Sequence, residues 1–246
     1  MNRTKYTALL LDADDTLLDF RAAEHAALGA LFRRVELELD EPTRELYAAI
    51  NRQLWSMYER GEIDRERLTG TRFRVLFEKL GVEIDGVAAD AAYREELGRQ
   101  HQLVDGALEV CEKLRARYRL YIVSNGVYTT QVPRLRDSGL TALMDGVFIS
   151  ERVGHAKPSP AFFDHVLMEI GAGRKEALIV GDSPASDIRG GVDSGIDTCW
   201  FNPLRSPQDE NIEPTYEIAS LHELLPLLLA DVALKTDRSG NPCASR

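Results

Sequence analysis

The chain has 246 residues, of which 44% are hydrophobic and 28% are charged, a balance typical of a folded globular protein. Its formal net charge of -10 and its isoelectric point near 5.1 argue against a nucleic-acid partner, because proteins that bind nucleic acid cluster an excess of Lys and Arg. No apolar stretch reaches the roughly 18 residues of a membrane span, and no signal peptide precedes the first apolar run. We therefore expect a cytoplasmic protein with no membrane partner.

The first predicted strand is a short apolar run that ends just before Asp12. Similar runs recur later, separated by segments of helical length, and strands that alternate with helices favour a doubly wound parallel sheet. The predicted strands are residues 6–11, 120–124, 146–150, 177–181 and 197–201. The sequence Ser220-Leu221-His222-Glu223 then predicts the start of a last helix through a capping box.

Between the first and second strands the alternation gives way to long amphipathic stretches that predict only helices. These stretches are residues 21–35, 42–59, 65–80 and 87–101. We interpret residues 19–102 as an inserted helical cap over an α/β core made of residues 1–18 and 103–235, with residues 236–246 as a loose tail. Such a cap is expected over the carboxyl ends of the strands, where open α/β sheets bind ligands.

The first strand ends in Asp12-Ala13-Asp14-Asp15-Thr16. Side chains two residues apart on an extended segment share a face, so Asp12 and Asp14 can reach one ligand. Two close carboxylates repel one another unless a cation or a shared proton offsets their charge. Mg2+ suits this role, because it prefers oxygen ligands and binds through a few carboxylates and a substrate phosphate.

Three further polar elements follow later strands or precede a helix. Ser124 and Asn125 come directly after a strand and offer a small anion cradle. Lys157 precedes a predicted helix that begins near Ser159-Pro160, and its charge can hold phosphate. Asp182 and Asp187 follow the fourth strand and add two carboxylates.

Together these four elements resemble the haloacid dehalogenase superfamily, whose motifs occur in the same order: DxDxT, a strand-end Ser or Thr, a Lys, and GDxxxD. The resemblance covers about residues 6–18 and 103–230, and the helical insertion lies where that superfamily carries a helical cap. It implies a Rossmann-like core under a cap and a magnesium-dependent hydrolase.

The resemblance also implies roles for the first motif. Asp12 is expected to attack phosphorus and form an aspartyl phosphate. Asp14 is expected to protonate the leaving oxygen and then to deprotonate the hydrolytic water. Dehalogenases of the superfamily lack this second carboxylate, so Asp14 favours phosphatase chemistry over the cleavage of carbon–halogen bonds.

The same resemblance implies ligands for the metal and the phosphate. Mg2+ is expected to contact Asp12, the backbone carbonyl of Asp14, and Asp182, with Asp187 acting directly or through a water. The groups expected to hold the phosphoryl oxygens are Ser124, Asn125 and Lys157.

The longer strings LLLDADDTLLDF and GDSPASDIRGGVDSGIDTCWFN are similar to those of the bacterial pyrimidine 5'-nucleotidases, which implies a nucleoside monophosphate as substrate. Three alternatives stay open: a phosphatase for small acids or sugars of the phosphoglycolate type, a 2-haloacid dehalogenase, and a non-catalytic relative that only binds phosphate. We expect a monomer or a homodimer.

Aromatic side chains recur at helical spacing in the predicted cap. Such side chains can stack on a base, but this spacing is more typical of a helical core, so we expect packing roles for all of them. They are Trp55, Tyr58, Phe73, Phe77 and Tyr93. Phe20, close after the first motif, can line the pocket, but packing is again the expected role.

Overall fold

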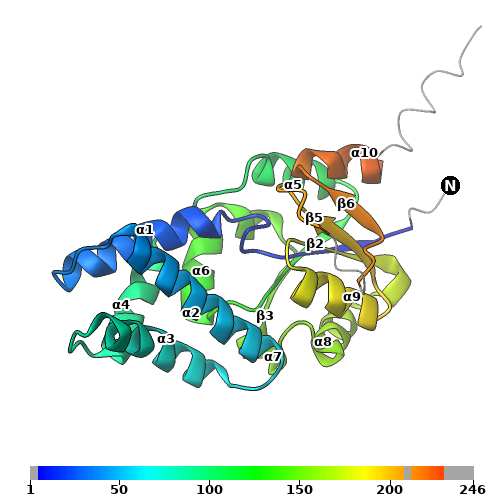
Figure 1. Ribbon diagram of the computed structural model, residues 1–246. Coiled ribbons are helices and arrows are strands. Elements are labelled where there is room, and N and C mark those ends of the chain that lie inside the picture. Colours follow the sequence, from blue (N-terminus) through cyan, green and yellow to red (C-terminus); the bar gives the residue numbers. More distant parts are fainter. Residues whose placement is uncertain (1–4, 208–211, 230–246) are drawn as a thin grey trace, which may run out of the picture.

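The computed structural model describes residues 5–207 and 212–229 (Figure 1). The predicted tail at residues 236–246 lies outside the described residues. Within the described ranges no helix is both long and apolar enough to cross a membrane.

In the described part of the chain, six parallel strands form one sheet, in the order β3-β2-β1-β4-β5-β6. The strands are β1 (Ala8–Leu11), β2 (Arg119–Ser124), β3 (Gly146–Ile149), β4 (Ala177–Gly181), β5 (Asp197–Phe201) and β6 (Tyr216–Ile218). The expected doubly wound parallel sheet is thus confirmed, with β1 and β4 side by side at its centre. The chain builds outward from β1 to β3 and then returns to the other side of β1 at β4.

The sixth strand lies between Phe201 and Ser220, a segment for which the sequence predicted no strand. β6 pairs with β5 at the edge of the sheet, and the backbone N–H of Asn202 donates to the carbonyl of Ile218. With three residues and a partly exposed surface, this strand has no apolar run from which to predict it.

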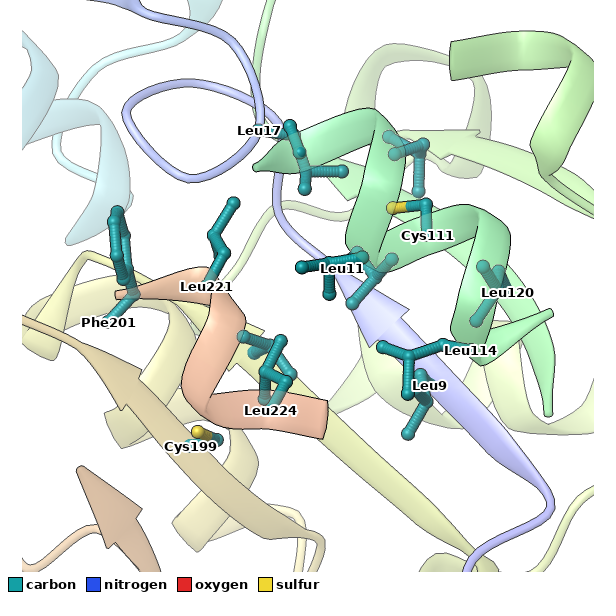
Figure 2. Packing of buried hydrophobic residues seen from close by; sticks show 14 of the residues in the cluster. Leu9, Leu11, Leu17, Cys111, Leu114, Leu120, Cys199, Phe201, Leu221 and Leu224 are labelled. Carbon is teal, nitrogen blue, oxygen red and sulfur yellow. The ribbon is translucent and has the colours of Figure 1, made fainter. Parts of the chain in front are cut away.

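Side chains of β1 alternate between the two faces of the sheet. Leu9 and Leu11 pack with α5 (Ala107–Leu114) and α10 (Leu224–Leu229) on one face, as Figure 2 shows. Leu10 packs on the other face, against α8 (Pro160–Ile170). Burial on both faces explains why the strand reads as a continuous apolar run.

The segment after β1 forms a block of helices, α1 (Phe20–Arg34), α2 (Glu41–Glu59), α3 (Arg65–Leu80) and α4 (Gly86–Gly98), called here the helical block. Its hydrophobic cluster draws on residues 20–97 alone. Asp19, Asp40, Asp64 and Asp85 cap the four helices through their side chains. In Figure 1 the block lies to one side of the sheet, over the ends of the strands.

Two linkers that run side by side join the helical block to the sheet. Leu18 forms an antiparallel bridge with Leu103, and the backbone N–H of Asp19 donates to the carbonyl of Gln102 over 2.9 Å. The chain therefore enters and leaves the block at one place.

Within the described residues, the remaining helical elements lie between strands, except for the 3-10 turn at Leu221–Glu223, which follows β6 and leads into α10. They are α6 (Tyr128–Asp137), α7 (Ser150–Val153), α9 (Arg189–Asp193), the 3-10 turns at Leu140–Leu143, Arg174–Glu176 and Leu221–Glu223, and a π-helical turn at Pro184–Ile188. Ser220 caps the final helical segment with the predicted capping box.

Candidate active site

The predicted site residues come together at the carboxyl ends of β1, β2 and β4. Asp12 follows β1 and Asp182 follows β4, so these two carboxylates flank the point at which the strand order reverses. Open α/β sheets bind their ligands at this point, because the loops from neighbouring strands diverge there and leave a crevice.

The loop after β1 is held in a tight turn. Asp15 adopts a left-handed backbone conformation with φ of 57°, which aspartate tolerates better than most residues. Its Oδ1 accepts hydrogen bonds from the backbone N–H groups of Phe20 and Arg21, at the start of α1. Thr16 donates to Asp12 Oδ2 over 3.0 Å and accepts from the backbone N–H of Asp182. This loop therefore links the first and fourth motifs.

Lys157 is buried beside two of the carboxylates. Its Nζ lies 2.6 Å from Asp12 Oδ1 and 2.7 Å from Asp187 Oδ1, and it donates to the carbonyl of Val123. Burial alone would lower the pKa of Lys157, but the charges of Asp12 and Asp187 outweigh it and raise that pKa above its ordinary value. The lysine is therefore a fixed cation in contact with the candidate nucleophile.

Asp12, Asp182 and Asp187 form an acidic cluster, with one carboxylate oxygen of each within 4.8 Å of the others. Burial raises the pKa of Asp12, helped by Asp187 against the opposing charge of Lys157. Burial, then the charges of Asp12 and Asp187, raise the pKa of Asp182 to about 9. Three carboxylates against one lysine leave an excess of negative charge, and their oxygen donors fit a hard divalent cation such as Mg2+.

Asp187 is only 1% exposed, although its place in the first helical turn after β4 also suits a surface residue. Its Oδ2 accepts from the backbone N–H of Ser183, while Oδ1 faces Lys157. Both oxygens of Asp187 therefore have protein partners, as do both oxygens of Asp12.

The loop after β2 is joined to Lys157 through its backbone. The side chain of Asn125 donates to the carbonyl of Lys157 over 2.8 Å and accepts from its backbone N–H over 2.9 Å. Ser124 Oγ accepts from the N–H of Gly126 over 3.0 Å. A Cβ on Gly126 would lie 2.4 Å from the side chain of Gln131, so a larger residue here would displace that side chain.

Asp14 does not face the acidic cluster with its side chain. Its Oδ1 pairs with Arg134, and its Oδ2 accepts from Gln131 Nε2 over 2.7 Å. Gln131 also donates to Ser124 Oγ over 2.9 Å. Arg134 is 1% exposed and donates through Nε to the carbonyl of Gln100 in the second linker.

The sequence analysis did not identify Gln131 or Arg134. Both lie on α6, three residues apart and hence on one helix face. Their position on the face of α6 that packs toward the strand ends becomes apparent only in the structure.

A cavity of about 430 Å³ opens over the site, within the range of about 300–1,000 Å³ typical of small-molecule sites. Its floor is made by Asp12, Asp14, Ser124, Asn125, Gly126, Lys157, Asp182, Ser183, Ser186 and Asp187. The helical block supplies the opposite wall, with Phe20, Asn51, Arg52, Trp55, Ser56 and Glu59.

Phe20, Trp55 and Tyr58 pack against the core of the block as expected, and Phe20 and Trp55 in addition line the cavity. Phe73, Phe77 and Tyr93 are buried in that core as expected. Glu59 is a further acidic group near the site, and burial together with the charge of Asp187 raises its pKa to about 7.

The chain resembles known hydrolases along most of its length. The family model for haloacid dehalogenase-like hydrolases matches residues 6–195. The putative HAD-hydrolase YfnB of Bacillus subtilis is 43% identical over 91% of this chain and 96% of its own length. The pyrimidine 5'-nucleotidases PynA of Streptococcus pneumoniae and YjjG of Escherichia coli are 37% and 34% identical, each over 91% of this chain and over 95% and 98% of their own lengths.

The fold agrees with these similarities. The crystal structure of YfnB bound to magnesium, described as revealing interdomain movement, superimposes with a TM-score of 0.87 over 92% of this chain and 99% of that one, at 42% identity. The superfamily indicated by the four motifs is confirmed, and the chain belongs to the haloacid dehalogenase-like hydrolases.

Proposed function

We propose that this protein is a magnesium-dependent phosphatase that hydrolyses pyrimidine nucleoside monophosphates through an aspartyl phosphate on Asp12. The observation that carries the proposal is the convergence of a buried lysine, three clustered carboxylates and a strand-end serine on the floor of one cavity. Phosphoryl transfer depends mainly on positioning and on neutralising charge, and this floor offers both.

In the first step a carboxylate oxygen of Asp12 forms a bond to phosphorus, and the bond from phosphorus to the ester oxygen breaks. Lys157 balances the charge of Asp12 over 2.6 Å and orients the nucleophile. Asp14 gives a proton to the ester oxygen, which leaves as an alcohol. The hydroxyl of Ser124 and the amide of Asn125 are the groups assigned to the transferring phosphoryl oxygens.

In the second step water attacks the phosphorus of the aspartyl phosphate and gives its proton to Asp14. The bond from phosphorus to the Asp12 oxygen breaks, so inorganic phosphate leaves and both carboxyl groups return to their starting states. Throughout, Gln131 and Arg134 hold Asp14 beside Ser124.

The acidic cluster supports a magnesium ion held by Asp12 and Asp182, by Asp187 directly or through a water, and by the backbone carbonyl of Asp14. When bound, such an ion neutralises the negative charge of the phosphoryl oxygens and of the clustered carboxylates.

A nucleotide substrate is supported by the wall of the cavity. Phe20 and Trp55 offer aromatic faces for a base, while Asn51, Ser56 and Glu59 offer hydrogen-bonding groups for a sugar or a base edge. The names of the relatives PynA and YjjG point to the same substrate class. We propose that residues 19–102 act as the cap that selects the substrate over the core formed by residues 1–18 and 103–235.

The nucleophile is tested by Asp12→Asn. We expect the release of phosphate from UMP or dTMP to fall at least about a thousandfold, because the amide cannot form the covalent intermediate, while thermal unfolding stays cooperative. Asp193→Asn, an exposed aspartate on α9, serves as the matched control and should keep full activity. Unchanged activity in Asp12→Asn would exclude the covalent route.

The substrate class is tested by turnover of UMP and dTMP against phosphoglycolate and ribose 5-phosphate, each with magnesium. We expect the nucleotides to be hydrolysed with the highest kcat/KM. A preference for phosphoglycolate would favour the small-acid phosphatase instead, and release of halide from 2-haloacids would favour a dehalogenase.

A further inference from the structure

Arg65 lies between the helical block and the sheet, at the first residue of α3. Its Nη2 lies 2.7 Å from the backbone carbonyl of Asn125, 2.8 Å from Ser150 Oγ and 2.7 Å from the hydroxyl of Tyr58. Asn125 belongs to the loop after β2, Ser150 is the first residue of α7 directly after β3, and Tyr58 belongs to α2. One guanidinium therefore connects two strand ends to the block.

Helix α3 does not itself favour a cation at this position. The N-terminal end of a helix carries partial positive charge, so an arginine in the first turn is electrostatically unfavourable there. The capping of α3 is supplied instead by Asp64, which accepts from the backbone N–H of Arg67. The bonds of Arg65 across the interface account for its place.

The contact with Asn125 connects Arg65 to Lys157 and Asp12. Asn125 is tied to the backbone of Lys157 by two reciprocal hydrogen bonds of 2.8 and 2.9 Å. Lys157 in turn contacts Asp12 through Nζ over 2.6 Å. A continuous chain of hydrogen bonds thus runs from the helical block to the candidate nucleophile.

On its other side Arg65 supports an aromatic pair of the block. Its guanidinium lies 4.8 Å from the ring centre of Tyr58 and 5.8 Å from that of Trp55, and these two rings meet edge to face at 5.7 Å. Trp55 lines the cavity above the catalytic floor. The arginine therefore contacts a wall of the cavity as well as its floor.

We propose that Arg65 is a positioning residue: it fixes the Asn125 loop and the Trp55 wall in one arrangement when the helical block lies against the sheet. This inference rests on the proposed phosphatase function. Arginine suits the role because its planar group donates hydrogen bonds at its edge and stacks on rings with its face, which lysine does not do.

The test compares Arg65→Met with Arg67→Met. Methionine keeps an unbranched stem at position 65 but removes the donors and the charge, while Arg67 is an exposed arginine on the same helical turn. Calorimetry in the presence of magnesium measures the Kd for inorganic phosphate, which reports on the Asn125 loop without turnover. Hydrolysis of UMP measures kcat/KM, which reports on the complete site. For Arg65→Met we expect at least a fivefold rise in the Kd for phosphate and at least a tenfold loss of kcat/KM, with both quantities within twofold of the original protein for Arg67→Met.

Ser150→Ala gives a milder test that removes one acceptor and keeps Arg65. We expect a rise in the phosphate Kd of about twofold or more, and a smaller effect of Arg65→Met when both changes are combined, because the two residues share one interaction. If Arg65→Met fails to fold, this variant alone decides, and an unchanged Kd overturns the proposal.

Hydrolysis of UMP by the original protein separates the role of Arg65 from the proposed function. If the original protein hydrolyses UMP and a folded Arg65→Met variant matches it within twofold in both Kd and kcat/KM, only the role of Arg65 is overturned. If the original protein hydrolyses no phosphate ester, the proposed function itself is wrong.

Discussion

Two regions of the molecule bury charged groups, and they do so differently. In the helical block Arg72 and Asp90 are 3% and 2% exposed and pair over 2.6 Å, and Arg94 pairs with the other oxygen of Asp90. At the strand ends Lys157 faces both Asp12 and Asp187.

The difference lies in the sign of the excess charge and in access to the cavity, since two arginines pair with Asp90 in the block. Neither Arg72 nor Asp90 lines the cavity, and the two side chains are hydrogen-bonded to each other inside the block. The strand-end group has more carboxylates than cations and opens onto the cavity. Burial of charge alone is therefore a poor indicator of function, whereas an unbalanced buried group at a cavity indicates a ligand of opposite charge.

The largest expected effect is that of Arg134→Met, which removes the cation beside Asp14 and leaves the acidic cluster unchanged. We expect kcat on UMP to fall about a hundredfold with KM within about twofold, because Asp14 is no longer held in place for proton transfer. Hydrolysis of p-nitrophenyl phosphate should suffer far less, because its leaving group needs no proton.

The matched control is Arg136→Met, an exposed arginine two residues along α6 that pairs with its neighbour Asp137. It should leave both substrates unaffected. An equal loss on UMP and p-nitrophenyl phosphate in Arg134→Met would show a general structural effect and contradict the role of Arg134 in positioning the acid.

Trp55→Ala tests whether the helical block contributes to binding of the base. If Trp55 stacks on the base, kcat/KM for UMP should fall about tenfold or more, as expected for the loss of one aromatic platform. Ribose 5-phosphate, which has no base, serves as the internal control and should be hydrolysed as before. Parallel losses on both substrates would contradict base recognition.

The smallest expected effect is thermal and concerns the acidic cluster. Burial raises the pKa of Asp12 to about 7 and that of Asp182 to about 9. An acid with a raised pKa in the folded state destabilises the fold as pH rises from about 4, its ordinary pKa, through the raised value, because the folded state holds its proton more tightly than the unfolded state. Magnesium binds the deprotonated carboxylates, so the stabilisation it gives should grow between pH 6 and pH 9.

Thermal scans with magnesium and with a chelator measure this difference. At a magnesium concentration about a hundredfold above Kd near pH 9, we expect the Tm to rise by about 5 °C or more, and by less at pH 6. Asp182→Asn should remove most of this pH dependence. A rise in Tm with magnesium that is the same at both pH values would contradict the assignment of Asp12 and Asp182 as magnesium ligands.

The core was predictable because its strands are buried on both faces and because its polar residues follow those strands directly. Leu9, Leu10 and Leu11 mark β1, and Asp12 stands at its end. Strand β6 was missed because three residues at a sheet edge carry no apolar pattern.

The residues that escaped prediction act through tertiary contacts. Arg134 meets Asp14 across 120 positions of the chain, and Arg65 meets Ser150 across 85. Each lies in an ordinary amphipathic helix, where an arginine is most often a surface residue. Only the packing of α3 and α6 against the strand ends distinguishes them, and no local spacing encodes that packing.

The paired linkers have a consequence for how this architecture diversifies. The backbones of Asp19 and Gln102 are hydrogen-bonded to one another, so the inserted segment begins and ends at one place beside the sheet, whatever its length. The clusters that pack on the sheet include no residue from 20 to 101. A chimera that carries a different helical segment between these two anchor points is expected to keep the sheet, but it would lose the contact of Arg65 with the backbone of Asn125, so the exchanged segment would have to supply its own contact to that loop.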